Sequence, residues 1–200
     1  MSAFNAQLLY CPSTIIDYVR IICLGVGIWC HGLGNEIGFV GFVMLSSVLD
    51  MVDGTLARRL GHTSRFGEVL DFGIDLVTHT VLWVLSGFPF APVMIVLEWG
   101  AGVSMFWLSA KQKEHWKTTL ANINVKLIQR YFENRQRNVL AVFAGISHFG
   151  FRIAWYLGYG EMWPADIFLP GVILFEVVTA YMIWIAWRVK MAVGHAHKPE

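Results

Sequence analysis

Residues 167–187 read IFLPGVILFEVVTAYMIWIAW, a continuous apolar stretch in which Glu176 is the one charged side chain. A helix needs about 20 mostly apolar residues to cross the ~30 Å hydrocarbon core of a bilayer, because each residue adds about 1.5 Å. The stretch is therefore long enough and apolar enough to cross a membrane. It predicts that this protein uses the bilayer as its solvent.

Five further stretches pass the same test, and with Ile167–Trp187 they predict six spans. They are Ser13–Cys30, Ile37–Ala57, Glu68–Ser86, Pro92–Ala110 and Asn138–Gly158. Pro12 and Pro92 stand where helices are expected to begin, and Gly87 and Gly158 where helices are expected to end. The chain is predicted to be an all-α integral membrane protein.

The composition agrees with this class. Of the 200 residues, 56% are hydrophobic and 14% are charged, whereas a soluble domain carries about 25% charged residues. So few charges cannot cover a water-facing surface of this size. The composition excludes a nucleic-acid binder, a disordered tail and a secreted disulfide scaffold, and we expect residues 1–200 to form a single membrane domain.

The basic residues predict the orientation of the chain. Thirteen of the 15 Lys and Arg lie in the loop between the second and third spans, in the segment Lys111–Arg137 or in the C-terminal tail. The other three hairpins contain none. Since cytoplasmic loops are the basic ones, both termini are expected to be cytoplasmic. Lys111–Arg137 is too charged to cross, and we expect it to form amphipathic helices at the surface. The N-terminus lacks a signal-peptide pattern, so we expect no cleavage there.

Four aspartates lie inside the second and third predicted spans, where each costs ~2.5–3.5 kcal/mol on insertion scales. Asp50 and Asp53 are three residues apart, and Asp71 and Asp75 are four apart. Each pair therefore projects from one face of its helix, near the cytoplasmic end. Residues this costly in a membrane are functional by default.

Carboxylates that converge in a low dielectric repel one another by several kcal/mol, so they need protons or a cation. Hard oxygen ligands suit Mg²⁺, Mn²⁺ or Ca²⁺, and the absence of His and Cys from the cluster argues against zinc. We predict a divalent metal site. The alternative is a helix pair whose acids are partly protonated.

Small and basic residues surround the acids. Gly54, Ala57 and Gly67 leave the helix faces bare, so that a bulky ligand can approach the backbone. Arg58 and Arg65 flank this region, and the planar fork of arginine suits phosphate oxygens. Together these residues indicate a site for a phosphoanhydride at the membrane surface.

The pattern carries a specific resemblance. Asp50-Met-Val-Asp53-Gly54-Thr-Leu-Ala57-Arg58, eight residues, Gly67, three residues, Asp71, three residues and Asp75 resemble the signature of the CDP-alcohol phosphatidyltransferase family. The resemblance implies a six-span enzyme that transfers a phosphatidyl group from CDP-diacylglycerol to an alcohol and releases CMP.

Within the family, the chain is most similar to the phosphatidylinositol synthases. The stretches Ile16-Asp-Tyr-Val-Arg-Ile-Ile22 and Ser64-Arg-Phe-Gly-Glu-Val-Leu-Asp71 carry this likeness. It implies a small polyol, myo-inositol, as the acceptor. Leu76 stands where those synthases usually have Arg, and Ile146-Ser147 where they tend to have Asn-Glu, so glycerol 3-phosphate and serine remain alternative acceptors.

The resemblance also implies roles for individual residues and two Mg²⁺ or Mn²⁺ ions. The metal ligands would be Asp50, Asp53, Asp71 and Asp75. Asp75 would also be the general base. The residues that bind CDP-diacylglycerol would be Gly54, Ala57, Arg58 and Gly67. Arg65, Arg135 and Arg137 would hold phosphate or the polyol, although Arg135 and Arg137 can equally mark the cytoplasmic side or contact anionic headgroups. A homodimer in the endoplasmic reticulum membrane is the assembly and compartment that the family suggests.

Glu98, Arg152 and Glu176 also lie inside predicted spans, at similar depths. We predict that Arg152 pairs with Glu98 or Glu176. His148 shows no partner pattern. Buried acids can also line a proton or cation pathway, but a transporter would place them near the midplane and show repeats. Here the aspartates cluster at one end and no repeat is evident, which favours the enzyme.

Overall fold

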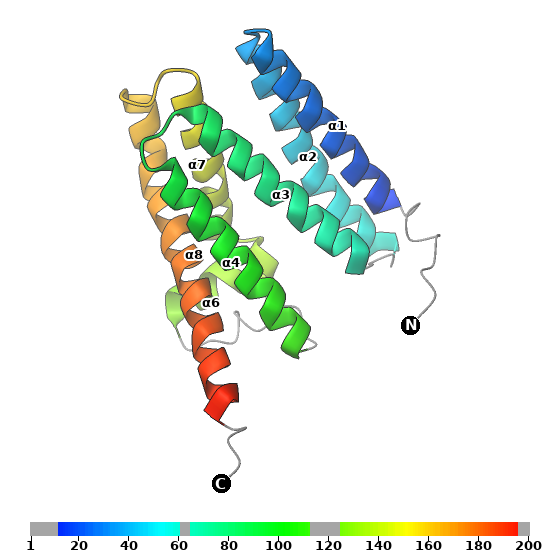
Figure 1. Cartoon of the computed structure of the whole chain (residues 1–200), viewed down its shortest axis with the longest axis vertical. Helices are drawn as coiled ribbons and strands as arrows, with labels where there is room; N and C mark the ends of the chain where they lie inside the picture. Colours follow the sequence, from blue (N-terminus) through cyan, green and yellow to red (C-terminus); the bar gives the residue numbers. More distant parts are fainter. Residues whose placement is uncertain (1–11, 61–64, 113–124, 196–200) are drawn as a thin grey trace. The chain divides into compact units, whose positions relative to one another are not determined.

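The computed structural model describes residues 12–60, 65–112 and 125–195, and every regular element within these ranges is a helix (Figure 1). Side chains are described there except at 12–13, 52–60, 65–66, 68, 109–112, 135, 164 and 189–195. The elements are α1 (Pro12–Gly32), α2 (Glu36–Leu60), α3 (Arg65–Ser86), α4 (Ala91–Gln112), α6 (Lys126–Phe132), the short 3-10 helix η2 (Glu133–Gln136), α7 (Val139–Tyr156) and α8 (Trp163–His195). The all-α prediction is confirmed for these residues.

Five of these helices are long and apolar enough to cross a membrane, as expected of a multi-pass membrane protein. The stretches are Thr14–Gly32, Val69–Ser86, Ala91–Leu108, Val139–Tyr156 and Ala165–Arg188. The side chains of α2 are described only as far as residue 51, too short a stretch to test for a span. The sixth span and the cytoplasmic termini therefore stay predictions.

The helix ends follow local sequence signals. The described part of α1 starts at Pro12, a residue type that suits the first helical turn, and the predicted helix start there stays a prediction. Gly87 directly follows α3 with φ of 67°, and Gly158 follows α7 with φ of 81°. Both backbones are left-handed, a conformation that glycine adopts without a steric cost. The two predicted helix ends are confirmed.

The contacts divide the chain into two compact units, Met1–Val81 and Leu82–Glu200. In the first unit, α1 and α2 form an antiparallel hairpin and pack side by side (Figure 1). Phe39 and Val43 of α2 are fully buried. Phe39 lies 3.5 Å from where a β-carbon at Gly27 would be, so the helices approach closely at that glycine. The prediction of a single domain over 1–200 stays a prediction.

In the second unit, α8 packs against both α4 and α7. One core cluster joins these helices to α6, whose Ile128, Tyr131 and Phe132 are buried. Lys126 and Arg130, on the other side of α6, are exposed. α6 thus has an apolar and a polar face, but its placement at a membrane surface stays a prediction. Residues 113–124 of the same segment lie outside the described residues.

A buried polar cluster also lies in the second unit. The Nε2 atom of His148 is 3.1 Å from Oε1 of Glu98 and 3.1 Å from Oε1 of Glu176. Trp83 donates its indole N–H to Glu98 at 2.6 Å, and Arg152 donates Nε–H to the backbone oxygen of His148 at 3.0 Å. Arg152 also interacts electrostatically with both glutamates. The side chain between the two acids is therefore His148, for which the sequence indicated no partner. A direct Arg152–glutamate pair stays a prediction.

The close approach of α7 and α8 yields a stability prediction. A β-carbon on Gly171 would lie 2.2 Å from the β-carbon of Ser147 and 3.2 Å from the backbone oxygen of Phe143. Gly171→Ala should destabilise the protein by about 1–3 kcal/mol, because the core cannot take the added methyl group without moving. A lower thermal unfolding midpoint in detergent will show this. Gly145→Ala is the matched control, since nothing lies within 4 Å of its β-carbon position. Equal midpoints for the two variants would contradict this close contact.

Candidate metal and substrate site

Three of the four predicted aspartates lie together. Asp50 comes from α2, while Asp71 and Asp75 come from successive turns of α3, and one carboxylate oxygen of each lies within 4.8 Å of the others. Their side chains are 39%, 40% and 44% exposed, respectively. The spacing of four residues aligns Asp71 and Asp75 on one face of α3. The predicted convergence of acids from two helices is present for these three residues.

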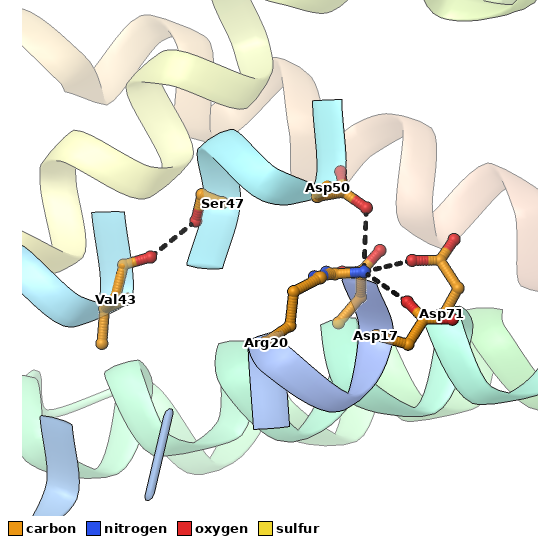
Figure 2. Close-up of polar contacts among 7 residues, drawn as sticks. Asp17, Arg20, Val43, Ser47, Asp50 and Asp71 are labelled. Atoms are coloured by element: carbon orange, nitrogen blue, oxygen red, sulfur yellow. Dashed lines mark hydrogen bonds and ion pairs between the residues drawn. The ribbon is translucent and has the colours of Figure 1, made fainter. Parts of the chain in front are cut away.

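A basic side chain from α1 lies at the centre of the cluster (Figure 2). The Nη1 atom of Arg20 is 3.1 Å from Oδ1 of Asp50 and also pairs with Oδ1 of Asp71. Its Nη2 atom pairs with Oδ1 of Asp75. Asp17, three residues earlier on α1, lies 3.4 Å from Nη1. One guanidinium therefore joins carboxylates from three helices.

Arg20 and Asp17 belong to the stretch Ile16–Ile22 that carries the family likeness, but neither of them was predicted to join the acid cluster. Arg20 lies within the predicted span Ser13–Cys30, and an ionisable residue inside a span is a functional candidate by default. Asp17 precedes it by three residues and so shares its helix face. The acids on α2 and α3 need a positive charge near them, and Arg20 on α1 provides it.

The residues present fit a divalent cation. Asp17, Asp50, Asp71 and Asp75, all ionised, carry four negative charges against the single positive charge of Arg20, so their sum is −3. Carboxylate oxygens are the donors that Mg²⁺ and Mn²⁺ prefer. Two oxygens on opposite sides of a Mg²⁺ ion lie about 4.2 Å apart, twice its usual ligand distance. The three oxygens lie within 4.8 Å of one another, so they are near enough to be brought onto one ion.

For the remaining motif residues the structure gives positions along helices. Asp53, Gly54, Ala57 and Arg58 lie on the last turns of α2, and Arg65 is the first residue of α3, but their side chains are outside the described residues. Gly67 is described and lies on α3, one turn before Asp71. Whether these residues meet the three aspartates stays a prediction.

The two other predicted arginines, Arg135 and Arg137, belong to the second unit. Arg135 lies in η2, with its side chain outside the described residues, and Arg137 follows η2 and is exposed. Asn138 fixes this turn, because it caps the first turn of α7 through Oδ1 and donates Nδ2–H at 2.9 Å to the backbone oxygens of Tyr131 and Glu133. The backbone that carries both arginines is therefore held at both ends.

Comparison with known proteins identifies the family of the chain. A family model described as CDP-alcohol phosphatidyltransferase matches residues 11–192. The chain is 28% identical over 170 residues to a CDP-diacylglycerol–inositol 3-phosphatidyltransferase from Candida albicans, an alignment that covers 80% of this chain and 71% of that protein. The search of solved structures found no match. Enzymes of the matched family generally use a divalent metal. The chain belongs to the CDP-alcohol phosphatidyltransferase family, a family of phosphotransferases.

Proposed function

We propose that the protein transfers the phosphatidyl group of CDP-diacylglycerol to a hydroxyl of myo-inositol, giving phosphatidylinositol and CMP, at the cytoplasmic face of the membrane. The observation that carries this proposal is the gathering of Asp50, Asp71 and Asp75 within 4.8 Å, in a chain whose family match spans residues 11–192. The inositol named for the Candida albicans relative supports the choice of acceptor.

The acids supply the metal ligands in this proposal. Asp50, Asp53, Asp71 and Asp75 hold two Mg²⁺ or Mn²⁺ ions, and these ions, when bound, neutralise the charge that develops on the departing CMP. The fit of the donor oxygens to a hard cation supports this assignment. The assignment of Asp53 as a metal ligand rests on the sequence motif alone.

Asp75 is the proposed general base. It accepts the proton of the attacking hydroxyl, whose oxygen bonds to the phosphorus of the phosphatidyl group while the bond from that phosphorus to the CMP oxygen breaks. A base must reach the hydroxyl that it deprotonates. Asp75 is 44% exposed and lies one turn further into the span than Asp71, which supports its contact with an acceptor.

Small and basic residues bind the two substrates in this proposal. Glycine and alanine on the facing helices leave room for the cytidine diphosphate, and arginines contact phosphate oxygens. The donor site comprises Gly54, Ala57, Arg58 and Gly67. The acceptor or phosphate site comprises Arg65, Arg135 and Arg137.

We further infer a homodimer in the endoplasmic reticulum membrane. The apolar helices require a bilayer, and the relative from Candida albicans comes from a eukaryote. Cross-linking in membranes and localisation of a tagged chain test these two inferences separately.

The function is tested with purified protein in vesicles that contain CDP-diacylglycerol. We expect CMP release to require an added alcohol, and myo-inositol to give at least about ten times the rate of glycerol 3-phosphate or serine, because a site that hydrogen-bonds the hydroxyls of a polyol discriminates against alcohols that lack them. EDTA should stop the reaction, and Mg²⁺ or Mn²⁺ should restore it.

The outcomes of this assay separate the parts of the proposal. A faster rate with glycerol 3-phosphate or serine would overturn inositol as the acceptor and leave the reaction type standing. Turnover that survives complete chelation would overturn the metal. No CMP release with any of the three alcohols would overturn the reaction itself.

A further inference from the structure

Arg20 approaches the three candidate metal ligands from the buried side of the site. Its side chain is 3% exposed, and that of its neighbour Asp17 is 1% exposed. Asp50, Asp71 and Asp75 are each at least 39% exposed. The guanidinium is thus covered, while each of the three acids keeps accessible surface that a metal or a phosphate can contact.

The contacts of Arg20 are divided between its two terminal nitrogens. Nη1 pairs with Asp50 and Asp71, both labelled in Figure 2. Nη2 pairs with Asp75, and each carboxylate uses its Oδ1 atom. A guanidinium is planar and its donors have a fixed spacing, so the positions of its partners are defined relative to one another. A single ammonium group would supply the charge without this geometry.

The acids need such a partner before any metal is bound. Like charges about 4–5 Å apart repel by several kcal/mol at the effective dielectric of a partly buried site. Asp50 is on a different helix from Asp71 and Asp75, so this repulsion can be relieved by moving α2 and α3 apart. A buried cation that pairs with both helices opposes that movement.

We propose, on the basis of the function proposed above, that Arg20 is a positioning residue that holds Asp50, Asp71 and Asp75 in their ligating arrangement in the metal-free protein. Asp17 in turn orients Arg20, because it lies beside Nη1 on the same face of α1. Arg20 acts through the carboxylates and is not itself a metal ligand or a catalytic residue.

A rival physical account predicts the opposite sign. If Arg20 only occupies the place of the metal, its positive charge competes with the ion, and its removal will tighten metal binding. If Arg20 positions the ligands, its removal will weaken metal binding even though a repelling charge has been lost. The sign of the change in metal affinity therefore distinguishes the two accounts.

The experiment measures Mn²⁺ binding to the purified full-length protein in detergent, by the electron paramagnetic resonance signal of free Mn²⁺, without substrates. We expect Arg20→Gln to raise the Kd for Mn²⁺ by about 10- to 100-fold, the usual effect of losing a residue that orients metal ligands. Arg20→Lys keeps the charge and should give a Kd between those of the wild type and Arg20→Gln. The matched control is Arg130→Gln, an exposed arginine on α6, which should leave the Kd unchanged.

The measurement distinguishes failure of the role proposed for Arg20 from failure of the proposed function. If the wild-type protein binds no Mn²⁺, the metal-dependent function is wrong. If the wild type binds Mn²⁺ and Arg20→Gln binds it equally or more tightly, the positioning role is wrong while the function stands. If Arg20→Gln does not fold, Arg20→Lys tests the proposal instead. A folded Arg20→Lys variant that binds Mn²⁺ with wild-type affinity would overturn the positioning role of the guanidinium.

Discussion

Asp71→Asn is expected to lower CMP release from CDP-diacylglycerol by at least about 100-fold while leaving the amount of folded protein unchanged. In the proposed site Asp71 is a metal ligand, and loss of a ligand costs at least as much as loss of a residue that orients one. Arg20 keeps Asp17, Asp50 and Asp75 as partners when Asp71 is replaced, so the substitution leaves no buried charge without a counter-charge. The substitution should therefore remove activity without unfolding the protein.

The measurement is CMP release by purified protein in vesicles, with the thermal unfolding midpoint taken from the same sample. Asp166→Asn is the matched control, because it makes the same chemical change at an exposed residue in the first turn of α8. It should keep nearly full activity. Undiminished turnover in Asp71→Asn would end the assignment of this residue to the metal.

Asp75→Asn should lower kcat by about 100- to 10,000-fold, the range that a positioned general base contributes, with the KM for CDP-diacylglycerol changed by less than about threefold. An amide cannot accept the proton of the attacking hydroxyl, but the donor does not need that proton in order to bind. The effect should therefore fall on kcat, which reports the bound complex.

Kinetics under saturating myo-inositol separate the two roles proposed for Asp75. If the KM for CDP-diacylglycerol rises in Asp75→Asn as far as it does in Asp71→Asn, Asp75 is assigned to the metal and removed as the base. Mn²⁺ binding to Asp75→Asn provides a second check. Wild-type affinity for Mn²⁺ together with a low kcat would agree with the base alone.

Much of the fold could be predicted from the sequence because the bilayer imposes a simple rule of length and polarity. The ends of α3 and α7 near Gly87 and Gly158 follow from a residue type with a strong local preference. The ends of α8 could not be predicted in this way. The helix extends over Trp163–His195, whereas the apolar stretch covers only 167–187. A helix continues through polar residues as long as its backbone hydrogen bonds continue, and hydropathy does not report those bonds.

The candidate site was predictable where spacing along one helix determined the geometry. The spacing of Asp71 and Asp75 placed them on one face of α3, and the sequence motif predicted that Asp50 would join them. The contact of Arg20 with these acids depends on how α1 lies beside α2 and α3, which no periodicity within α1 reports. The same holds for His148, which lies between Glu98 and Glu176 from two other helices. Arg20 and His148 both have partners on other helices, and residue spacing within one helix does not report such contacts.

The ion pairs of Arg20 also bear on how the protein is made. A membrane protein is synthesised from its N-terminus, and domains generally fold as units in that order. Asp17, Arg20, Asp50, Asp71 and Asp75 all lie within the first 75 residues. The whole constellation is therefore present in the nascent chain before α4 has left the ribosome, and α1 must be inserted for the acids on α2 and α3 to find their counter-charge. An N-terminal truncation that removes α1 would thus leave a cluster of unneutralised carboxylates in the membrane.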